Sequence, residues 1–350
     1  MKVLVISKPV YDYILPLEEF PMEGDKFYIN NSINTLSNVG SLVAITFSRY
    51  GLDTSFTGVL GEDDIANKIK DIFIENKVDI SYMETNYTEK TCISYKIYNK
   101  KTNKFTSIIE NSLKTNLTKF KYEFIPEVII MDDKDYSANL AAINNYTNAK
   151  FIFVADKYNK ESSVYLNKCN YIICDLKFAS DVTGVNSDLS KSKNMITLFQ
   201  KYYDLYNSNL IIKNNNFDIY YCVDDEVRII KNINKNLINK ENVYYSVLSF
   251  FLVYNVDIEN AIKYTNEVML NSNSDLDMIK NIPDYKNVYD CYLEYKNLNE
   301  SNQTISNVIE TKDNVNIIQN NDPISQNVNQ PILNNNQSNL DDGVKDVETL

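Results

Sequence analysis

The 350-residue chain contains no histidine and no tryptophan, only seven glycines and only five cysteines. Without histidine, neither a Ser-His-Asp or Cys-His catalytic group nor a histidine-ligated zinc site can form. General acid and base chemistry would fall to carboxylates, lysine, tyrosine or cysteine. The cysteines are odd in number and contain no C-x-x-C pair, which predicts buried free thiols in a reducing compartment.

Positive charge is also scarce. The formal net charge is −12, from 35 basic and 47 acidic residues, and only Arg49 and Arg228 are arginines. Because nucleic-acid binding requires clustered lysine and arginine, we expect no nucleic-acid partner. The N-terminal apolar run is short and lacks a cleavage signal, and no apolar stretch reaches about 18 residues. These features predict a cytoplasmic protein without a membrane partner.

Short β-rich runs alternate with longer helical patterns along most of the chain. Strands are expected at Val3–Ser7, Ser55–Leu60, Glu127–Met131, Lys150–Ala155, Tyr171–Cys174, Leu210–Ile212 and Asp218–Cys222. Helices are expected at Ser41–Tyr50, Ile65–Asn76, Ser137–Tyr146, Ser192–Tyr206, Tyr244–Asn255 and Ile258–Leu270. This alternation predicts an α/β fold with a mostly parallel central sheet and helices on both faces.

Two segments depart from the alternation. Phe27–Asn31 and Cys92–Ile109 are typical of strands with alternating character, and we expect them to form a small separate sheet over one end of the main one. From residue 299 onward the composition changes: residues 299–350 include 13 of the chain's 51 asparagines, no aromatic residue and a net charge of −6. Such a segment cannot bury enough apolar surface to fold, which predicts a folded domain over 1–298 and a disordered, acidic tail over 299–350.

The segment Asn38–Ser81 resembles the N-terminal signature of the ribokinase-like, or PfkB-type, family of sugar and nucleoside kinases. Ala44, Gly51 and Gly61 fall at the family's spacing, and Arg49-Tyr50-Gly51 ends the expected helix as the family's Arg-Leu-Gly does. Further matches follow in the family's order: Val10-Tyr11-Asp12, Pro21-Met22-Glu23-Gly24, Val154-Ala155-Asp156, Ala179–Gly184, Val256–Ala261 and Asn281-Ile282-Pro283.

The resemblance implies a three-layer α/β/α sandwich with a small β lid, ATP and Mg²⁺ as cofactors if the protein is active, and a small sugar or nucleoside as ligand. It also implies that Asp12 and Gly40 contact the substrate, and that two copies pair through the lid. The substrate-binding asparagine of the family falls on Leu42, and its Gly-Gly turn on Ser37-Asn38.

The catalytic motif of the family, D-T-x-G-A-G-D, falls on residues 239–245. Asn242 and Tyr244 replace its two glycines, which form the anion hole, and Tyr245 stands at the position of the catalytic base. A phenol with a reference pKa of about 10 is a poor base at neutral pH. Glu241, one helical turn before Tyr245, is the only nearby carboxylate that could substitute.

Other nucleotide-side positions of the family are changed as well. Its N-x-x-E motif, which helps to hold Mg²⁺ and phosphate, falls on Asp175 and Phe178; Asp175 could still attract Mg²⁺, but Phe178 could not. Its T-x-G-x-x-G strand end falls on Lys213–Asp218, where no glycine remains. We expect no built metal site.

Three hypotheses follow. The first is a pseudokinase that retains the fold for ligand binding or assembly but has lost phosphoryl transfer. The second is an active, divergent Mg-ATP-dependent kinase acting on the hydroxymethyl group of a small sugar or nucleoside. The third is a non-enzymatic interaction protein that acts through its acidic tail.

Overall fold

The computed structural model describes residues 1–155, 157–185, 192–232, 237, 239–298 and 344–347. Their centre is a nine-stranded sheet in the order β15-β14-β13-β12-β11-β10-β9-β1-β4. It is parallel except at β13, which runs antiparallel to β12 and β14. The strands are β1 (Lys2–Ile6), β4 (Asp53–Thr57), β9 (Val128–Asp132), β10 (Lys150–Ala155), β11 (Tyr171–Asp175), β12 (Asn209–Lys213), β13 (Ile219–Val223), β14 (Glu226–Ile230) and β15 (Val344–Val347).

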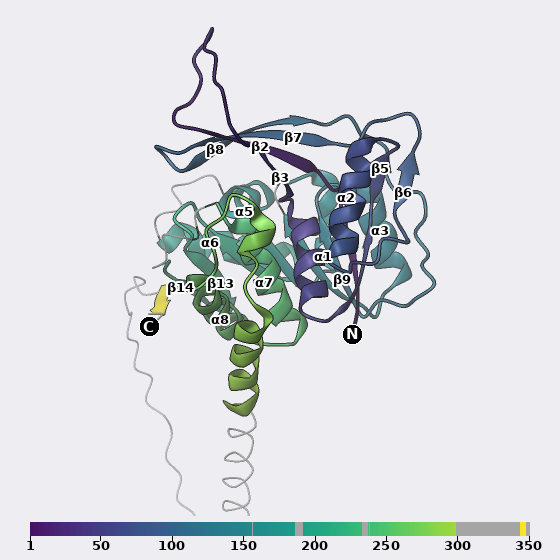
Figure 1. The fold of residues 1–350 in the computed structure, drawn as a ribbon. Coiled ribbons are helices and arrows are strands. Elements are labelled where there is room, and N and C mark those ends of the chain that lie inside the picture. The colour runs from purple at the N-terminus through teal and green to yellow at the C-terminus, as the bar shows by residue number, and fades with distance from the viewer. Residues whose placement is uncertain (156, 186–191, 233–236, 238, 299–343, 348–350) are drawn as a thin grey trace, which may run out of the picture.

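The inner strands are apolar on both faces because alternate side chains enter two different cores. In β1, Val3 and Val5 lie in one core, and Leu4 and Ile6 lie in the other. Helices cover both faces of the sheet (Figure 1), which confirms the predicted three-layer α/β/α sandwich. The helices of the first core are α1 (Val39–Arg49), α2 (Asp64–Glu75), α7 (Glu241–Val253) and α8 (Ile258–Leu270), and those of the second are α3 (Tyr136–Asn145), α4 (Ser163–Leu166), α5 (Leu176–Thr183) and α6 (Ser192–Leu205).

Aspartate side chains begin four of these helices. Asp63, Asp135, Asp175 and Asp257 each accept a hydrogen bond from a backbone N–H in the first turn of α2, α3, α5 and α8 respectively. Helix α7 differs, because the residue before it is Lys240, which makes no side-chain capping hydrogen bond. Helix α1 likewise begins without a side-chain cap, at Asn38, so no capping side chain satisfies the first backbone N–H groups of α1 or α7.

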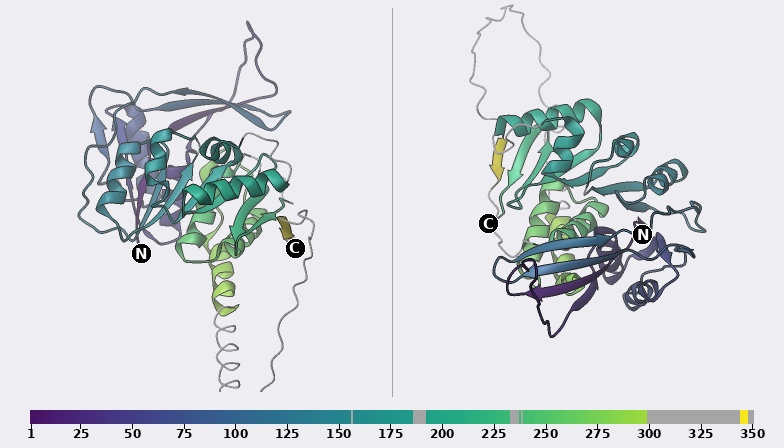
Figure 2. Two further views of the ribbon diagram at one scale, coloured as in Figure 1. Left: turned by 180° about the vertical axis from the view of Figure 1, so that it is seen from behind. Right: turned by 90° about the horizontal axis from the view of Figure 1, so that it is seen from above.

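The lid is a four-stranded sheet in the order β3-β2-β7-β8, and it lies across one end of the central sheet (Figure 2). Its strands are β2 (Tyr11–Leu17), β3 (Ile33–Leu36), β7 (Ile93–Asn99) and β8 (Lys104–Glu110). The hairpin β7–β8 confirms the strands predicted within 92–109. The strand predicted at Phe27–Asn31 is wrong, because these residues belong to the β2–β3 loop and pair with no strand; Tyr28 there is 94% exposed.

Smaller elements complete the described chain. Strands β5 (Val59–Gly61) and β6 (Glu84–Asn86) form a parallel pair, and one-turn helices lie at η1 (Lys160–Ser162) and η3 (Met278–Asn281). Residues 285–298 form a helix that projects from the body (Figure 1). The predicted disordered tail, 299–350, lies outside the described residues except for β15, a strand that the sequence did not predict and that pairs in parallel with β14.

Candidate functional site

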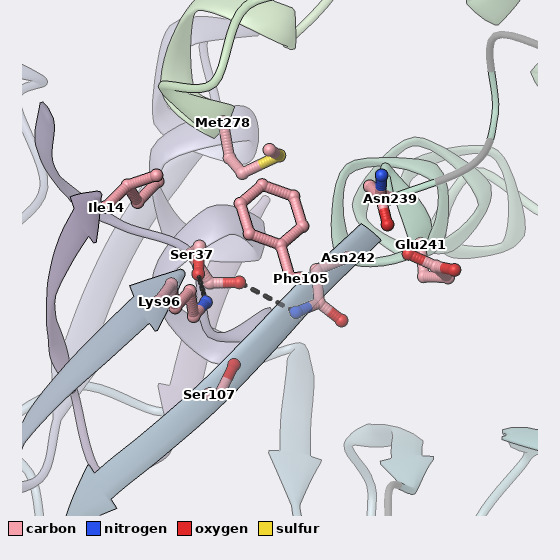
Figure 3. Close-up of a pocket in the computed structure, with 9 residues that line it drawn as sticks. All are labelled: Ile14, Ser37, Lys96, Phe105, Ser107, Asn239, Glu241, Asn242 and Met278. Carbon is pink, nitrogen blue, oxygen red and sulfur yellow. Dashed lines mark hydrogen bonds between the residues drawn. The ribbon is translucent and has the colours of Figure 1, made fainter. Parts of the chain in front are cut away.

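A cavity of about 390 Å³ lies between the lid and the carboxyl ends of the central strands. Parallel sheets place ligands at this edge, because strand ends and helix beginnings meet there. Asp132, Asp175 and Lys213 are the last residues of β9, β11 and β12, and all three line the cavity. A second hollow of about 200 Å³ adjoins it beneath the lid hairpin (Figure 3).

Five of the six predicted site residues meet in the larger cavity: Asp12, Asp175, Glu241, Asn242 and Tyr245. Gly40 does not line it. It lies in the first turn of α1, where an added Cβ would overlap the side chain of Ser7 in the connection that follows β1. Glycine at position 40 therefore allows α1 to approach the end of β1, and a contact between Gly40 and a substrate stays a prediction.

Asp12 is buried in a hydrogen-bond network made by the chain itself. Ser37 Oγ donates to Asp12 Oδ2, and Lys96 Nζ lies 3.1 Å from the same oxygen and also donates to Ser37 Oγ. Asp12 and Lys96 both come from the lid, on the adjacent strands β2 and β7. One oxygen of the carboxylate that the resemblance assigned to a substrate hydroxyl is therefore already engaged by two donors.

The beginning of α7 is tied to the segment before α1. Asn242 Nδ2 donates to the carbonyl oxygen of Ser37 at 2.7 Å, and Figure 3 shows Asn242 and Lys96 reaching Ser37 from opposite sides. Glu241 precedes Asn242, and its Oε1 lies 3.9 Å from Lys213 Nζ at the end of β12. A helix beginning carries about half a positive charge, so the Glu241 carboxylate compensates it locally.

Tyr245 is buried one turn into α7. Burial, together with the nearby Cys174, Glu241, Asp175 and Tyr244, raises the pKa of its phenol well above the usual value. A group with such a pKa stays protonated at neutral pH and cannot accept a proton from a substrate hydroxyl. The position that the sequence resemblance assigns to the base therefore holds a phenol that stays protonated.

The position assigned to Mg²⁺ is used for structure. Asp175 Oδ1 accepts the backbone N–H of Phe178 at 2.7 Å and so begins α5. Phe178 is fully buried and packs against Phe153 and Tyr158. Across the described residues, no group of three or more histidine, cysteine, aspartate or glutamate side chains is arranged to hold a metal ion.

Among the cavity residues that the sequence did not predict are Asp132 and Lys96. Asp132 is 2% exposed; it accepts hydrogen bonds from Ser7 Oγ and from the backbone N–H of Lys134. Burial raises the pKa of Asp132 to about 7, against the opposing effect of Lys134. The sequence could have indicated Asp132, because it is an acidic residue that ends an otherwise apolar strand, Val128–Asp132. Lys96 carried no signal, because only the lid register places it beside Asp12.

Comparisons with known proteins give a clear answer at the level of fold. No protein-family model and no curated protein matches the sequence. Among solved structures, a putative ribokinase from Agrobacterium tumefaciens is 13% identical with a TM-score of 0.72, over 85% of this chain and 98% of that one. Arabidopsis thaliana ribokinase complexed with ribose and ATP is 13% identical with a TM-score of 0.67, over 83% and 97% of the two chains.

A third neighbour is the nucleoside kinase of Methanocaldococcus jannaschii, an archaeal member of the ribokinase family. It is 14% identical, with a TM-score of 0.64 over 84% of this chain and 98% of that chain. The chain therefore has the ribokinase-like fold, as the sequence resemblance predicted, and its structure is similar to those of PfkB-type carbohydrate and nucleoside kinases. Within the described residues, no helix is both long and apolar enough to cross a bilayer.

Proposed function

We propose that this protein is a ribokinase-like pseudokinase, which binds a small polar ligand in the cavity beneath its lid and does not transfer phosphate. The observation that carries the proposal is Tyr245, a buried phenol with a strongly raised pKa at the position of the base. Phosphoryl transfer to a hydroxyl needs both a base and an anion-stabilising group at the phosphate. Neither requirement is met by the first two turns of α7.

The beginning of α7 supports the same conclusion. In a glycine-containing helix beginning, backbone N–H groups can approach a phosphate closely. Here the Asn242 side chain is bonded to Ser37, and Glu241 adds a negative charge in the same turn. Both features oppose a triphosphate at this position.

The test is a turnover assay on the full chain with Mg-ATP and a panel of sugars and nucleosides, followed by ADP release. We expect no acceptor-dependent ADP above the no-enzyme rate, while thermal shift detects at least one acceptor as a ligand. Acceptor-dependent ADP formation at many turnovers per protein molecule would show that the pseudokinase assignment is wrong.

The active-kinase alternative has one favourable observation. The Glu241 carboxylate lines both hollows and its side chain is 39% exposed, so it is open to a ligand. If Glu241 acted as the base with Asp12 holding the acceptor, Glu241→Gln and Asp12→Asn would each abolish turnover. In the structure this carboxylate faces a cation, since Glu241 Oε1 lies 3.9 Å from Lys213 Nζ.

Assembly is a second part of the proposal. On the lid face opposite the cavity, Tyr95 stacks on Tyr13 with ring centroids 5.6 Å apart and lies across from Ile108, which is 60% exposed. We propose that this apolar face pairs two copies. Light scattering after size exclusion should give a dimer that Ile108→Lys converts to a monomer; a monomeric wild-type chain contradicts the pairing.

Two further proposals remain from the sequence. The five cysteines are free, four of them buried, which suits the reducing cytoplasm that we propose as the location.

Recruitment of a partner by residues 299–350 is the third functional hypothesis, and pull-downs with and without that segment test it. Equal partner sets from the two forms would count against a recruiting tail.

A further inference from the structure

The cavity carries more negative than positive charge. Five carboxylates and three ammonium groups are among the described residues that line it. Even with about half a positive charge from the beginning of α7, the lining stays negative. A phosphorylated ligand would therefore meet net repulsion, whereas a cationic one would be attracted.

The three lysines are all engaged with carboxylates. Lys96 pairs with Asp12, Lys134 pairs with Asp133 at 2.8 Å, and Lys213 faces Glu241. The two remaining carboxylates of the lining are Asp132 and Asp175. No ammonium or guanidinium group of the described residues lies within ion-pair distance of either of them.

Asp132 is the better placed of the two to take a cation. Asp132 is the more deeply buried of the two, at 2% exposed, and each of its oxygens accepts one hydrogen bond from an uncharged donor: Oδ2 from Ser7 Oγ and Oδ1 from the backbone N–H of Lys134. A buried carboxylate without a cationic partner gains most from a ligand that brings one. The raised pKa of Asp132, caused mainly by burial, fits a site that is incomplete without such a partner.

An independent observation comes from the opposite wall of the cavity. Ser94 is 1% exposed, lines the cavity, and its hydroxyl has no hydrogen-bond partner in the described structure. It lies two residues before Lys96 on β7, so both side chains are on the same face of the lid strand, and both residues line the cavity. An unpaired buried hydroxyl in a ligand cavity is a group that a polar ligand can satisfy.

The geometry points to a hydroxyl-rich small molecule that carries a primary amine as the ligand of this cavity, with its ammonium on Asp132 and a hydroxyl on Ser94. This inference rests on the proposed ligand-binding function and specifies its ligand class. A phosphate ester of the same compound is excluded by the same charges that attract the amine.

Two matched sets of ligands test the inference on the full chain by titration calorimetry. The first is glucosamine, glucose and glucose 6-phosphate; the second is 5′-amino-5′-deoxyadenosine, adenosine and AMP. In at least one set we expect the amine to bind about ten-fold or more tightly than the alcohol, and the phosphate to bind more weakly than the alcohol. Asp132→Asn should remove the amine preference, while the exposed Asp71→Asn on α2 should retain it.

The outcomes separate the inference from the proposed function. Equal binding of amine and alcohol, or tighter binding of the phosphate, overturns the amine assignment but leaves a ligand-binding pseudokinase. Absence of binding by all six compounds contradicts both the amine assignment and ligand binding. If Asp132→Asn does not fold, the ranking within each set on the wild-type chain still decides the matter.

Discussion

The side-chain amide of Asn242 donates a 2.7 Å hydrogen bond to the main-chain carbonyl of Ser37, joining the first turn of α7 to the loop before α1. These residues are far apart in sequence, so the bond is a tertiary contact between two helix beginnings at the cavity. In the pseudokinase that we propose, the same contact would also occupy space that a transferred phosphoryl group needs.

Asn242→Ala should lower the free energy of unfolding by about 1 kcal/mol, because the Ser37 carbonyl loses its donor. Urea denaturation followed by circular dichroism measures the change, since the chain has no tryptophan to report by fluorescence. Asn67→Ala is the matched control, because Asn67 is an exposed asparagine inside α2 and gains the same helix propensity. Equal effects of the two changes would mean that the bond to Ser37 contributes nothing.

Tyr245→Asp restores the residue type that the family uses as a base, yet we expect no kinase activity from it. Its carboxylate would be buried on a helix whose first turn still carries Glu241 and Asn242. The free energy of unfolding should fall by about 3 kcal/mol, because a buried charge without a partner is costly. Tyr245→Phe, which keeps the ring, should stay within about 0.5 kcal/mol of wild type. Measurable turnover by Tyr245→Asp would show that one residue alone separates this chain from an active kinase.

The raised pKa of Asp132 predicts a pH-dependent stability. With a folded-state pKa of about 7 and an unfolded value of about 3.9, the folded protein binds more protons between these limits. Its stability should therefore fall as pH rises from about 4 to 7, by an upper limit of about 4 kcal/mol. Asp132→Asn should gain stability relative to wild type on going from pH 4 to pH 8, whereas Asp71→Asn should show a constant offset. A pH-independent difference for Asp132→Asn would contradict the assignment.

The buried pair Asp12–Lys96 should be energetically coupled. A double-mutant cycle with Asp12→Asn and Lys96→Met is expected to give about 2 kcal/mol, because either single change leaves a partly desolvated charge unpaired. The Lys101–Glu19 pair on the same lid provides the comparison: its two side chains are well exposed, and we expect no measurable coupling there. Similar coupling at both pairs would mean that burial of Asp12 has no energetic consequence.

The sequence allowed the fold to be predicted because its main signals are local. Continuous apolar strands such as Val128–Asp132 and the helix-ending Gly51, whose φ is +82°, mark elements that need no distant partner to be recognised. The lid strands were harder to predict, because Phe27–Asn31 has the composition of a strand but the residues that pair with β2 are Ile33–Leu36. Strand pairing depends on a partner that composition does not reveal.

Only part of the site could be predicted, because some of its residues are placed by motif order and others only by strand pairing. Asp12, Glu241, Asn242 and Tyr245 could be found because motif order places them, and they do meet in one cavity. The pairing of Lys96 with Asp12 depends on the register between β2 and β7, which no single-sequence pattern specifies. Predicting Asp132 as a site residue requires one further argument: an acidic residue that ends a strand of a parallel sheet lies at the edge where such sheets bind ligands.

Strand β15, at Val344–Val347, has a consequence for biosynthesis. It forms the outer edge of the sheet beside β14, although residues 344–347 are synthesised well after β14 and after the helices α7 and α8. Until then β14 presents unpaired N–H and C=O groups, the kind of edge at which nascent chains associate wrongly. A chain that ends at residue 298 lacks β15 and leaves this edge open, so it should aggregate more readily than a chain that includes residues 344–347.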